Sequence, residues 1–202
     1  MSSSYRSWDR VYHEYPLGEL PWELGKPRPV LVQLIEEGLV KPGKTLDICC
    51  GAGTNTVYMA KKGFESTGLD ISHKAIEYGR EKAQEAGVKI RWIVGNALGF
   101  PFEDGEFNFV FHMGCFHHIR LEDRTKFISG LCRIIKPSGQ YLLTCFSDRN
   151  GPAWNHFTKD QLIQLFSDRF MFQKAAHYSS VEGDGLTRFF FSILMQKKQK
   201  PC

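Results

Sequence analysis

An apolar run in this chain ends at Cys49 and Cys50, and two glycines, Gly51 and Gly53, follow it. A helical pattern begins directly after them, so the segment has the pattern of a buried strand that turns sharply into a helix. Such a turn places free backbone N–H groups and the positive end of a helix dipole beside a crevice. Glycine lets a ligand lie against the backbone because it has no Cβ. The pattern predicts a nucleotide-type ligand, although glycine-rich turns also serve purely structural ends.

A carboxylate, Asp70, ends the next predicted strand after the glycine turn. A carboxylate at that place can accept hydrogen bonds from both hydroxyls of a ribose. The alternative is a local role, in which Asp70 complements the dipole of the helix that Ser72 begins. The glycine turn upstream favours the ribose role.

Two adjacent histidines, His117 and His118, follow a later apolar run and are the visible candidates for a proton acceptor. Because adjacent side chains diverge, we expect at most one of them to point into a site. The alternative for His118 is packing against a cofactor or starting a helix, and we favour it. We interpret His112 as a hydrogen-bonded packing residue. The catalytic residues therefore stay unassigned.

The composition is that of a soluble globular chain. Of its 202 residues, 42% are hydrophobic and 24% charged, and the formal net charge is +4. One domain with a substantial core is expected. The sequence has no basic helix, arginine cluster or zinc-finger spacing, which argues against nucleic acid as a partner. No apolar run approaches membrane-spanning length, so a membrane is not expected as a partner either.

The six cysteines form no C-x-x-C pair, and most of them lie in apolar runs. Cysteine in such a run behaves as a small hydrophobic residue, so a disulfide scaffold is not expected and a reducing compartment fits better. The spacing of cysteines and histidines is wrong for zinc, and no metal is predicted. The first residues lack the apolar core of a signal peptide. We therefore expect the protein to be cytoplasmic.

Strand and helix patterns alternate from Thr45 to Tyr141, which is typical of a mostly parallel sheet covered on both faces. The predicted strands cover 45–49, 65–70, 90–94, 107–113, 140–146, 170–178 and 186–196. The strand 90–94 has the pattern of a sheet edge, and the last two strands form an antiparallel hairpin. The predicted helices begin near Pro29, Gly53, Ser72, Leu121 and Thr158, and Pro137 ends the fourth.

Ligands of such sheets bind beyond the carboxyl ends of the strands. The glycine turn, Asp70 and residues 114–118 all fall there. Three segments far apart in the sequence thus converge on one predicted crevice.

Residues 7–29 are rich in aromatic side chains and broken by prolines, so we expect an irregular course. They form either a cap over one end of the core or a lid whose aromatic faces contact a ligand. Both interpretations stand for Trp22, and the cap is favoured for Trp8. We expect a single domain over 1–202, divided into this cap or lid (1–29), a cofactor-binding core (30–147), and a C-terminal helix and hairpin (148–202).

The glycine turn matches neither common phosphate-binding motif, because it lacks a third glycine and Thr54–Asn55 is not a Lys–Ser/Thr pair. Five short motifs, the glycine turn among them, stand in an order and spacing that resembles the class I S-adenosylmethionine-dependent methyltransferases. They are Leu46–Gly53, Gly68–Ser72, Gly95–Ala97, Phe107–Val110 and Lys136–Gly139. Cys49 replaces the first glycine of that family's cofactor turn and brings a Cβ toward the cofactor, and Asn96 replaces its usual aspartate.

The resemblance implies S-adenosylmethionine as the cofactor and an α/β, Rossmann-like, doubly wound fold. Its seven-stranded, mostly parallel sheet would have the strand order 3-2-1-4-5-7-6 and end in an antiparallel hairpin. The turn would hold the amino-acid end of the cofactor, Asp70 its ribose and Asn96 its adenine. The implied cofactor-binding residues are Trp22, Asp47, Cys49, Gly51, Gly53, Asn55, Asp70, Ile71, Asn96, Ala97, Met113 and His118.

Residues 21–27 and 114–118 are similar to small-molecule methyltransferases that act on thiols, thiopurines, halides or tellurite. This likeness implies direct in-line methyl transfer to a small-molecule nucleophile. The alternative is a protein that binds S-adenosylmethionine without catalysis, as a regulatory or partner subunit, and the altered glycine and aspartate motivate it. The sequence names neither the methyl acceptor nor the oligomeric state.

Overall fold

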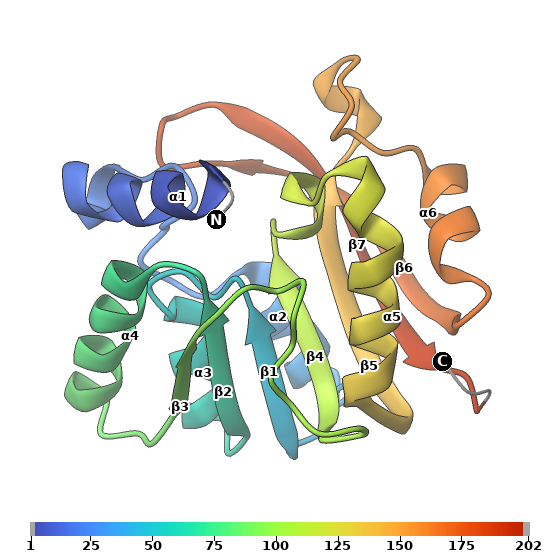
Figure 1. Cartoon of the computed structure of the whole chain (residues 1–202), viewed down its shortest axis with the longest axis horizontal. Helices are drawn as coiled ribbons and strands as arrows, with labels where there is room; N and C mark the ends of the chain where they lie inside the picture. Colours follow the sequence, from blue (N-terminus) through green and yellow to red (C-terminus); the bar gives the residue numbers. More distant parts are fainter. Residues whose placement is uncertain (1–2, 200–202) are drawn as a thin grey trace. The chain divides into compact units, whose positions relative to one another are not determined.

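The computed structural model describes residues 3–199, and its seven strands form one sheet (Figure 1). The strand order is β3-β2-β1-β4-β5-β7-β6, as predicted. The pairs β1–β2, β2–β3 and β4–β5 are parallel, whereas β5 and β7 are antiparallel. The doubly wound, Rossmann-like fold with an antiparallel C-terminal hairpin is therefore confirmed, and β3 lies at the predicted sheet edge.

The strands are β1 (Lys44–Ile48), β2 (Glu65–Asp70), β3 (Arg91–Val94), β4 (Phe107–Met113), β5 (Ile135–Phe146), β6 (Phe170–Val181) and β7 (Thr187–Lys197). The α-helices are α1 (Ser3–Glu14), α2 (Pro29–Glu36), α3 (Thr54–Lys61), α4 (His73–Glu85), α5 (Arg124–Ile134) and α6 (Lys159–Phe166). Short 3₁₀ turns are η1 (Leu17–Glu19), η2 (Phe116–His118), η3 (Leu121–Asp123) and η4 (Asp148–Asn150). No helix within residues 3–199 is long and apolar enough to cross a membrane.

Two compact units divide these elements. The first unit runs to Ala97 and also contains the turn Val181–Leu186, and the second contains the remainder of the chain from Leu98 onward. The first unit therefore holds β1 to β3 with α1 to α4, and the second holds β4 to β7 with α5 and α6.

The N-terminal segment differs from the predicted irregular course, because residues 3–14 form α1. Trp8 and Tyr12 stand four residues apart, a spacing that places both side chains on one face of a helix. The helix packs against α4, and Asp9 accepts a hydrogen bond from the Ser72 hydroxyl at 2.8 Å. Two of the aromatic residues that suggested irregularity, Trp8 and Tyr12, thus lie on one face of a helix, and Tyr12 is 4% exposed.

The junction of α5 and β5 also differs from the prediction. β5 begins at Ile135, and Pro137 lies within this strand instead of ending the helix. Ser138 has a left-handed backbone, with φ of 61°, and the pairing of β4 with β5 shifts register between Phe107 and Phe109. Such an irregularity accommodates a proline, which donates no hydrogen bond to its neighbouring strand.

Two predicted helix starts are confirmed by their caps. The Ser72 hydroxyl accepts a hydrogen bond from the Ala75 N–H at 3.0 Å at the start of α4. Thr158 and Gln161 exchange side-chain and backbone hydrogen bonds at the start of α6. Both caps satisfy N–H groups that the first helical turn leaves without a partner.

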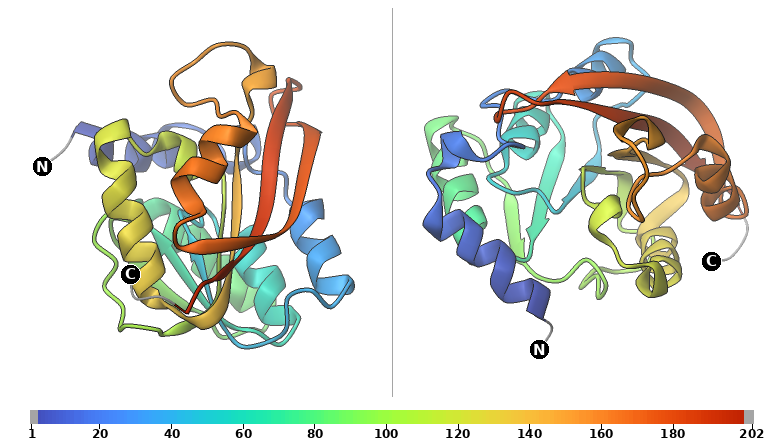
Figure 2. Two further views of the ribbon diagram at one scale, coloured as in Figure 1. Left: turned by 90° about the vertical axis from the view of Figure 1, so that its right-hand side faces the viewer. Right: turned by 90° about the horizontal axis from the view of Figure 1, so that it is seen from above.

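In the second unit, β6 and β7 run side by side as a long ribbon (Figure 2). The core of the second unit is built largely from aromatic rings that are almost completely buried. They are Phe107, Phe109, Phe111, Phe116, Phe127, Tyr141, Phe157, Phe166 and Phe170. This packing fixes the ends of β4 and β5 and the loops that follow them.

The cysteines differ from the expectation. Cys50 and Cys145 are free and buried, whereas Cys49, Cys115 and Cys132 are disulfide-bonded. The expectation that disulfides play no part is therefore wrong for these three. An apolar sequence context does not separate the two states, because a buried thiol and a buried disulfide are both apolar.

Trp92 of β3 packs against three glycines of the first unit. A Cβ on Gly53, Gly68 or Gly79 would lie 2.4, 2.5 or 2.8 Å from an atom of the indole ring. Real Cβ atoms do not approach other atoms so closely. The ring thus accounts for glycine at Gly79 by packing, and at Gly53 it adds to the left-handed backbone, which favours glycine by itself.

We expect Gly79→Ala to lower the free energy of unfolding by about 1–3 kcal/mol, because the added methyl group overlaps the Trp92 ring. At an unhindered position inside a helix the same change stabilises by about 1 kcal/mol. In a Trp92→Leu background, Gly79→Ala should therefore raise the free energy of unfolding. Urea denaturation measures this change. Gly18→Ala is the control, since nothing lies within 4 Å of its Cβ position. A loss that persists without the ring would contradict the packing explanation.

Candidate cofactor site

The turn between β1 and α3 has a left-handed backbone at three positions. The φ angles of Cys49, Gly51 and Gly53 are 54°, 55° and 73°. The Gly53 N–H donates to the Cys50 carbonyl at 3.0 Å, which closes the turn just before α3. A left-handed residue other than glycine costs about 1–2 kcal/mol, so Cys49 holds an unfavourable conformation. Its side chain is exposed.

Asp70 joins this turn to the end of β2. Its Oδ2 accepts the Gly51 N–H at 2.8 Å, and its Oδ1 accepts the Ser72 N–H at 2.9 Å. The residue is 7% exposed. Burial raises the pKa of its carboxyl, and the backbone N–H groups of Ser72 and Gly51 oppose that shift. Each oxygen has a second lone pair, so the fixed carboxylate can still accept hydrogen bonds.

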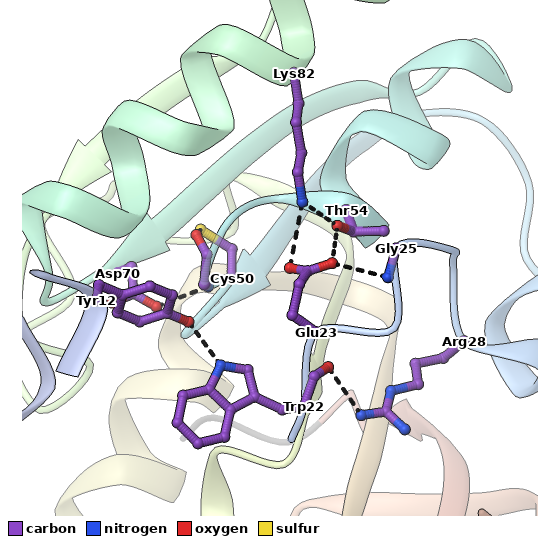
Figure 3. A network of polar contacts seen from close by, with 10 residues as sticks. Tyr12, Trp22, Glu23, Gly25, Arg28, Cys50, Thr54, Asp70 and Lys82 are labelled. Atoms are coloured by element: carbon purple, nitrogen blue, oxygen red, sulfur yellow. Dashed lines mark hydrogen bonds and ion pairs between the residues drawn. The ribbon is translucent and has the colours of Figure 1, made fainter. Parts of the chain in front are cut away.

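Two aromatic side chains of the N-terminal segment lie over the turn (Figure 3). The Trp22 indole Nε1–H donates to Tyr12 Oη at 2.9 Å, and a Cβ on Gly51 would lie 2.6 Å from that same oxygen. Trp8 completes the cluster, with its ring 5.5 Å from that of Trp22. Burial is the main cause that raises the pKa of Tyr12, and the nearby Asp70 adds to it. Tyr12 is a site residue that the sequence did not predict, and its helical spacing from Trp8 was the available signal.

A partly buried ion pair ties the same segment to α3 and α4 (Figure 3). Glu23 Oε1 accepts the Thr54 hydroxyl at 2.7 Å, and Glu23 Oε2 lies 3.3 Å from Lys82 Nζ. Lys82 also donates to Thr54 Oγ1 at 2.7 Å. The Glu23 side chain is 9% exposed. Three elements that are distant in sequence thus meet at the first residue of α3.

In the second unit, the two adjacent histidines differ in exposure. His117 is buried and stacks on Phe146, with ring centroids 3.8 Å apart, whereas His118 is exposed. Burial lowers the pKa of the His117 imidazole, and the neighbouring His118 adds to that shift; loss of hydration at the protein surface lowers the pKa of His118. His112 Nε2 lies 2.7 Å from Tyr141 Oη, and its Nδ1 accepts the Cys115 N–H. His112 is therefore the hydrogen-bonded packing residue that the sequence predicted.

Comparison with known proteins shows which family this part of the chain matches. A family profile described as a methyltransferase domain matches residues 45–139, which include the glycine turn and Asp70. Residues 45–139 therefore form a methyltransferase domain, and the predicted resemblance to the class I S-adenosylmethionine-dependent methyltransferases is confirmed.

Curated relatives share about a third of the residues of this methyltransferase domain. The 2-heptyl-1-hydroxyquinolin-4(1H)-one methyltransferase of Mycobacteroides abscessus is 31% identical over 127 residues, which cover 62% of this chain and 56% of the relative. A probable chloroplastic tocopherol O-methyltransferase of Oryza sativa subsp. japonica is 30% identical over 178 residues, which cover 78% of this chain and 48% of the relative. The chain thus spans about half the length of these relatives.

Solved structures share the fold at lower identity. A structure described as the conversion of a disulfide bond into a thioacetal group during echinomycin biosynthesis has a TM-score of 0.85 and 22% identity, covering 96% of this chain and 93% of that chain. A 1,6-didemethyltoxoflavin-N1-methyltransferase of Burkholderia thailandensis has a TM-score of 0.70 and 19% identity, covering 98% and 85%. At these identities the likeness shows the methyltransferase fold.

Like Asp70 and Trp22, two further predicted cofactor residues bond to protein groups. Asp47 is 2% exposed, and its Oδ2 accepts the Thr56 hydroxyl at 2.7 Å. Burial raises the pKa of this carboxyl to about 8. The Asn55 amide oxygen accepts the Arg28 N–H at 2.9 Å. Asp47 therefore links β1 to α3 inside the unit, and Asn55 holds the N-terminal segment.

Four other predicted cofactor residues lie at or just after the carboxyl ends of β2, β3 and β4. Ile71 is half-buried, Asn96 is exposed and Ala97 is 7% exposed. The segment before Asn96 is tied to β2, because the Gly95 N–H donates to the Asp70 carbonyl at 2.8 Å. In the second unit, Met113 is half-buried at the end of β4. Within the described part of the chain, no cluster of three or more His, Cys, Asp or Glu side chains is arranged for a metal.

Proposed function

We propose that this methyltransferase domain binds S-adenosylmethionine and transfers its methyl group to a small-molecule nucleophile. The observation that carries the proposal is the Asp70 carboxylate, which the Gly51 and Ser72 N–H groups hold beside a left-handed glycine turn. Such a carboxylate suits ribose hydroxyls, because its two oxygens can accept more hydrogen bonds than the neighbouring backbone N–H groups donate to them.

The residues present fit the cofactor. Gly51 has no Cβ and a left-handed backbone, so the Tyr12 hydroxyl can approach a face of the turn that a side chain would otherwise cover. The Tyr12 hydroxyl and the adjacent Trp22 ring lie at that face and offer a polar group and an aromatic surface. When bound, the sulfonium of S-adenosylmethionine supplies an electrophilic methyl group. Positioning then provides much of the rate, since methyl transfer is an in-line displacement.

The names of the relatives support a small organic acceptor. They are a hydroxyquinolinone methyltransferase, a norajmaline N-methyltransferase and a tocopherol O-methyltransferase. We infer that this domain also acts on a small molecule through direct transfer to its nucleophilic atom. The predicted cytoplasmic location stays a prediction.

A second candidate is a protein that binds the cofactor without catalysis. Cys49 stands in place of a glycine at the turn, and the Tyr12 hydroxyl already occupies the open face of Gly51. Turnover against a panel of thiols, amines, phenols and halides separates the two candidates. Tight binding of S-adenosylhomocysteine without methylation of any acceptor would favour the non-catalytic role.

We expect Asp70→Asn to weaken the binding of S-adenosylhomocysteine by about 1–3 kcal/mol, because a ribose hydroxyl loses its charged acceptor. Isothermal titration calorimetry measures the change, and circular dichroism confirms that the variant is folded. Glu65→Gln is the matched control, an exposed carboxylate at the other end of the same strand. An unchanged affinity in the Asp70 variant would contradict the ribose role.

A further inference from the structure

The Tyr12 hydroxyl lies at the turn between β1 and α3, and its proton is unused (Figure 3). Its oxygen accepts the Trp22 indole N–H at 2.9 Å. A phenol oxygen that accepts one hydrogen bond still has its own proton to donate. Within residues 3–199, the Tyr12 O–H meets no acceptor, although the residue is only 4% exposed. A buried donor without an acceptor costs free energy, so this proton points to a bound ligand.

The surroundings of Tyr12 keep the hydroxyl protonated. Burial is the main cause that raises the pKa of the phenol, and the nearby Asp70 adds to the shift, whereas the Trp22 N–H opposes it. The hydroxyl therefore keeps its proton at neutral pH. Because the indole already occupies its oxygen, the hydroxyl can serve a ligand as a donor.

The turn itself offers backbone donors of the same kind. Gly53 is the N-cap of α3, and no side chain caps this helix. The N–H of Thr54, the first residue of α3, has no partner inside the helix. In the described part of the chain, neither this N–H nor that of Ala52 donates to another group. A Cβ on Gly51 would lie 2.6 Å from Tyr12 Oη, so the phenol and these N–H groups border one short segment.

The charges at this turn suit a carboxylate. The N–H groups at the start of α3 carry the positive end of the helix dipole. Lys82 Nζ lies 3.3 Å from Glu23 Oε2 and balances the acid that bonds to Thr54. Asp70 already accepts two backbone N–H groups. A ligand carboxylate would meet O–H and N–H donors here, whereas an ammonium group would find none of them able to accept its protons.

Tyr12 is held in place by the contacts of its own helix. Asp9 Oδ1 accepts the Ser72 hydroxyl at 2.8 Å and the Lys74 N–H at 3.0 Å, which fixes α1 on the start of α4. The Tyr12 ring packs in an apolar cluster with Ala75 of α4. All of these residues belong to the first unit. The donor is therefore preorganised, which reduces the cost of ordering it when a ligand binds.

We propose that Tyr12 donates its O–H to the carboxylate at the amino-acid end of the cofactor and so selects ligands that carry this group. The inference rests on the proposed function and deepens it, because it assigns a specificity determinant within the cofactor site. Tyr12 is then a binding residue without a part in proton transfer. Trp22 is a positioning residue, since its N–H decides which way the Tyr12 proton is free to point. A hydrogen bond to a carboxylate is about twice as strong as one between neutral groups.

The test compares two ligands that differ only in the carboxylate. They are S-adenosylhomocysteine and its decarboxylated form, S-adenosyl-3-thiopropylamine. In Tyr12→Phe we expect the affinity for S-adenosylhomocysteine to fall about 10- to 100-fold in isothermal titration calorimetry, because a hydrogen bond to a charged group is lost. The affinity for the decarboxylated form should change less than about threefold, since the hydroxyl has no charged partner in that complex.

The control is Tyr78→Phe, which removes the hydroxyl of a tyrosine packed against the same apolar cluster. Both ligands should bind to this variant as they bind to the wild type. In Tyr12→Phe the Trp22 N–H loses its acceptor in the free protein and in both complexes. That cost therefore cancels when the affinities for the two ligands are compared.

The outcomes distinguish this inference from the proposed function. An unchanged affinity for S-adenosylhomocysteine in Tyr12→Phe overturns the inference alone. An equal loss for both ligands does so too, because Tyr12 would then act on another part of the molecule or only on the fold. A wild type that binds neither S-adenosylmethionine nor S-adenosylhomocysteine overturns the proposed function, and the inference falls with it.

A second measurement needs only the wild-type protein with each ligand. A hydroxyl that donates to a carboxylate becomes a better acceptor, so the Trp22 N–H bond to Tyr12 should strengthen. We expect the ¹H resonance of this indole N–H to move downfield when S-adenosylhomocysteine binds, and to move less with the decarboxylated form. The spectrum of Trp22→Phe identifies the resonance by its absence. An equal shift with both ligands would overturn the assignment.

Discussion

Replacing Glu182 with alanine should lower the free energy of unfolding by about 3–5 kcal/mol, because it leaves a buried guanidinium without its carboxylate. Glu182 lies in the turn between β6 and β7 that belongs to the first unit. Its two carboxylate oxygens accept from Nη1 and Nη2 of Arg28, each at 2.7 Å. The Arg28 side chain is only 10% exposed and the Glu182 side chain only 4%. A paired contact of this geometry is among the strongest ion pairs in proteins.

The same ion pair anchors the N-terminal segment. Arg28 also donates to the Trp22 carbonyl at 3.2 Å, and the Gly183 N–H donates to the Pro21 carbonyl at 2.7 Å. Loss of the pair should therefore loosen the aromatic cluster over the glycine turn as well. We expect faster amide hydrogen exchange at Trp22 and Glu23 in Glu182→Ala.

Urea denaturation of two further variants tests this explanation. Arg28→Met with Glu182→Met removes both charges, and it should recover most of the lost stability because no uncompensated charge stays buried. Glu14→Ala removes an exposed pair with Arg10 and should cost less than about 1 kcal/mol. If Glu182→Ala costs no more than Glu14→Ala, the buried pair does not hold the segment.

Asp47→Asn should stabilise the protein by an amount that grows with pH. The pKa of Asp47 is about 8 in the folded protein and 3.8 as its ordinary value, and burial is the main cause. Between these values the folded protein binds the extra proton, so raising the pH favours unfolding. The slope is about 1.4 kcal/mol per pH unit. Asparagine does not titrate, and its amide oxygen can still accept the Thr56 hydroxyl.

The measurement is the difference in unfolding free energy between Asp47→Asn and the wild type at pH 5, 6 and 7. We expect this difference to rise by about 3 kcal/mol over the range and to level off above pH 8. The buried His112 and His117, whose pKa values are lowered, oppose this trend by making both proteins more stable as the pH rises toward 6.5. Their contribution cancels in the difference. A difference that does not change with pH would show that Asp47 is ionised in the folded protein.

Local patterns in the sequence were sufficient for the alternation of strands and helices and for the main features of the glycine turn, whereas the strand order was implied by the family resemblance. Apolar runs that stop at Gly51, Asp70 and Gly114 mark the carboxyl ends of three strands. Parallel strands place those ends at one edge of a sheet. The fold prediction succeeded because this inference needs only the order of elements along the chain.

Local patterns were less informative where two explanations share one signature. Glycine at Gly53 and Gly79 is required by the Trp92 ring, which comes from another element. The aromatic residues of the N-terminal segment are compatible both with an irregular cap and with the helix α1 that the structure contains. Cysteines in apolar runs are compatible both with free thiols and with disulfides. In each case the missing information was the neighbour in space.

The sequence by itself predicted the fold, the resemblance to the methyltransferases and the position of Asp70 at a strand end, because these follow from contiguous motifs and strand ends. Only the tertiary structure decided that Tyr12 covers Gly51 and that Arg28 pairs with Glu182, 154 residues away. It alone also gave the Tyr12 oxygen the Trp22 N–H as its donor. The physical reason is that burial, ion pairing and hydrogen bonding depend on which groups the packed chain brings within a few ångströms, and no local pattern of residues records those distances.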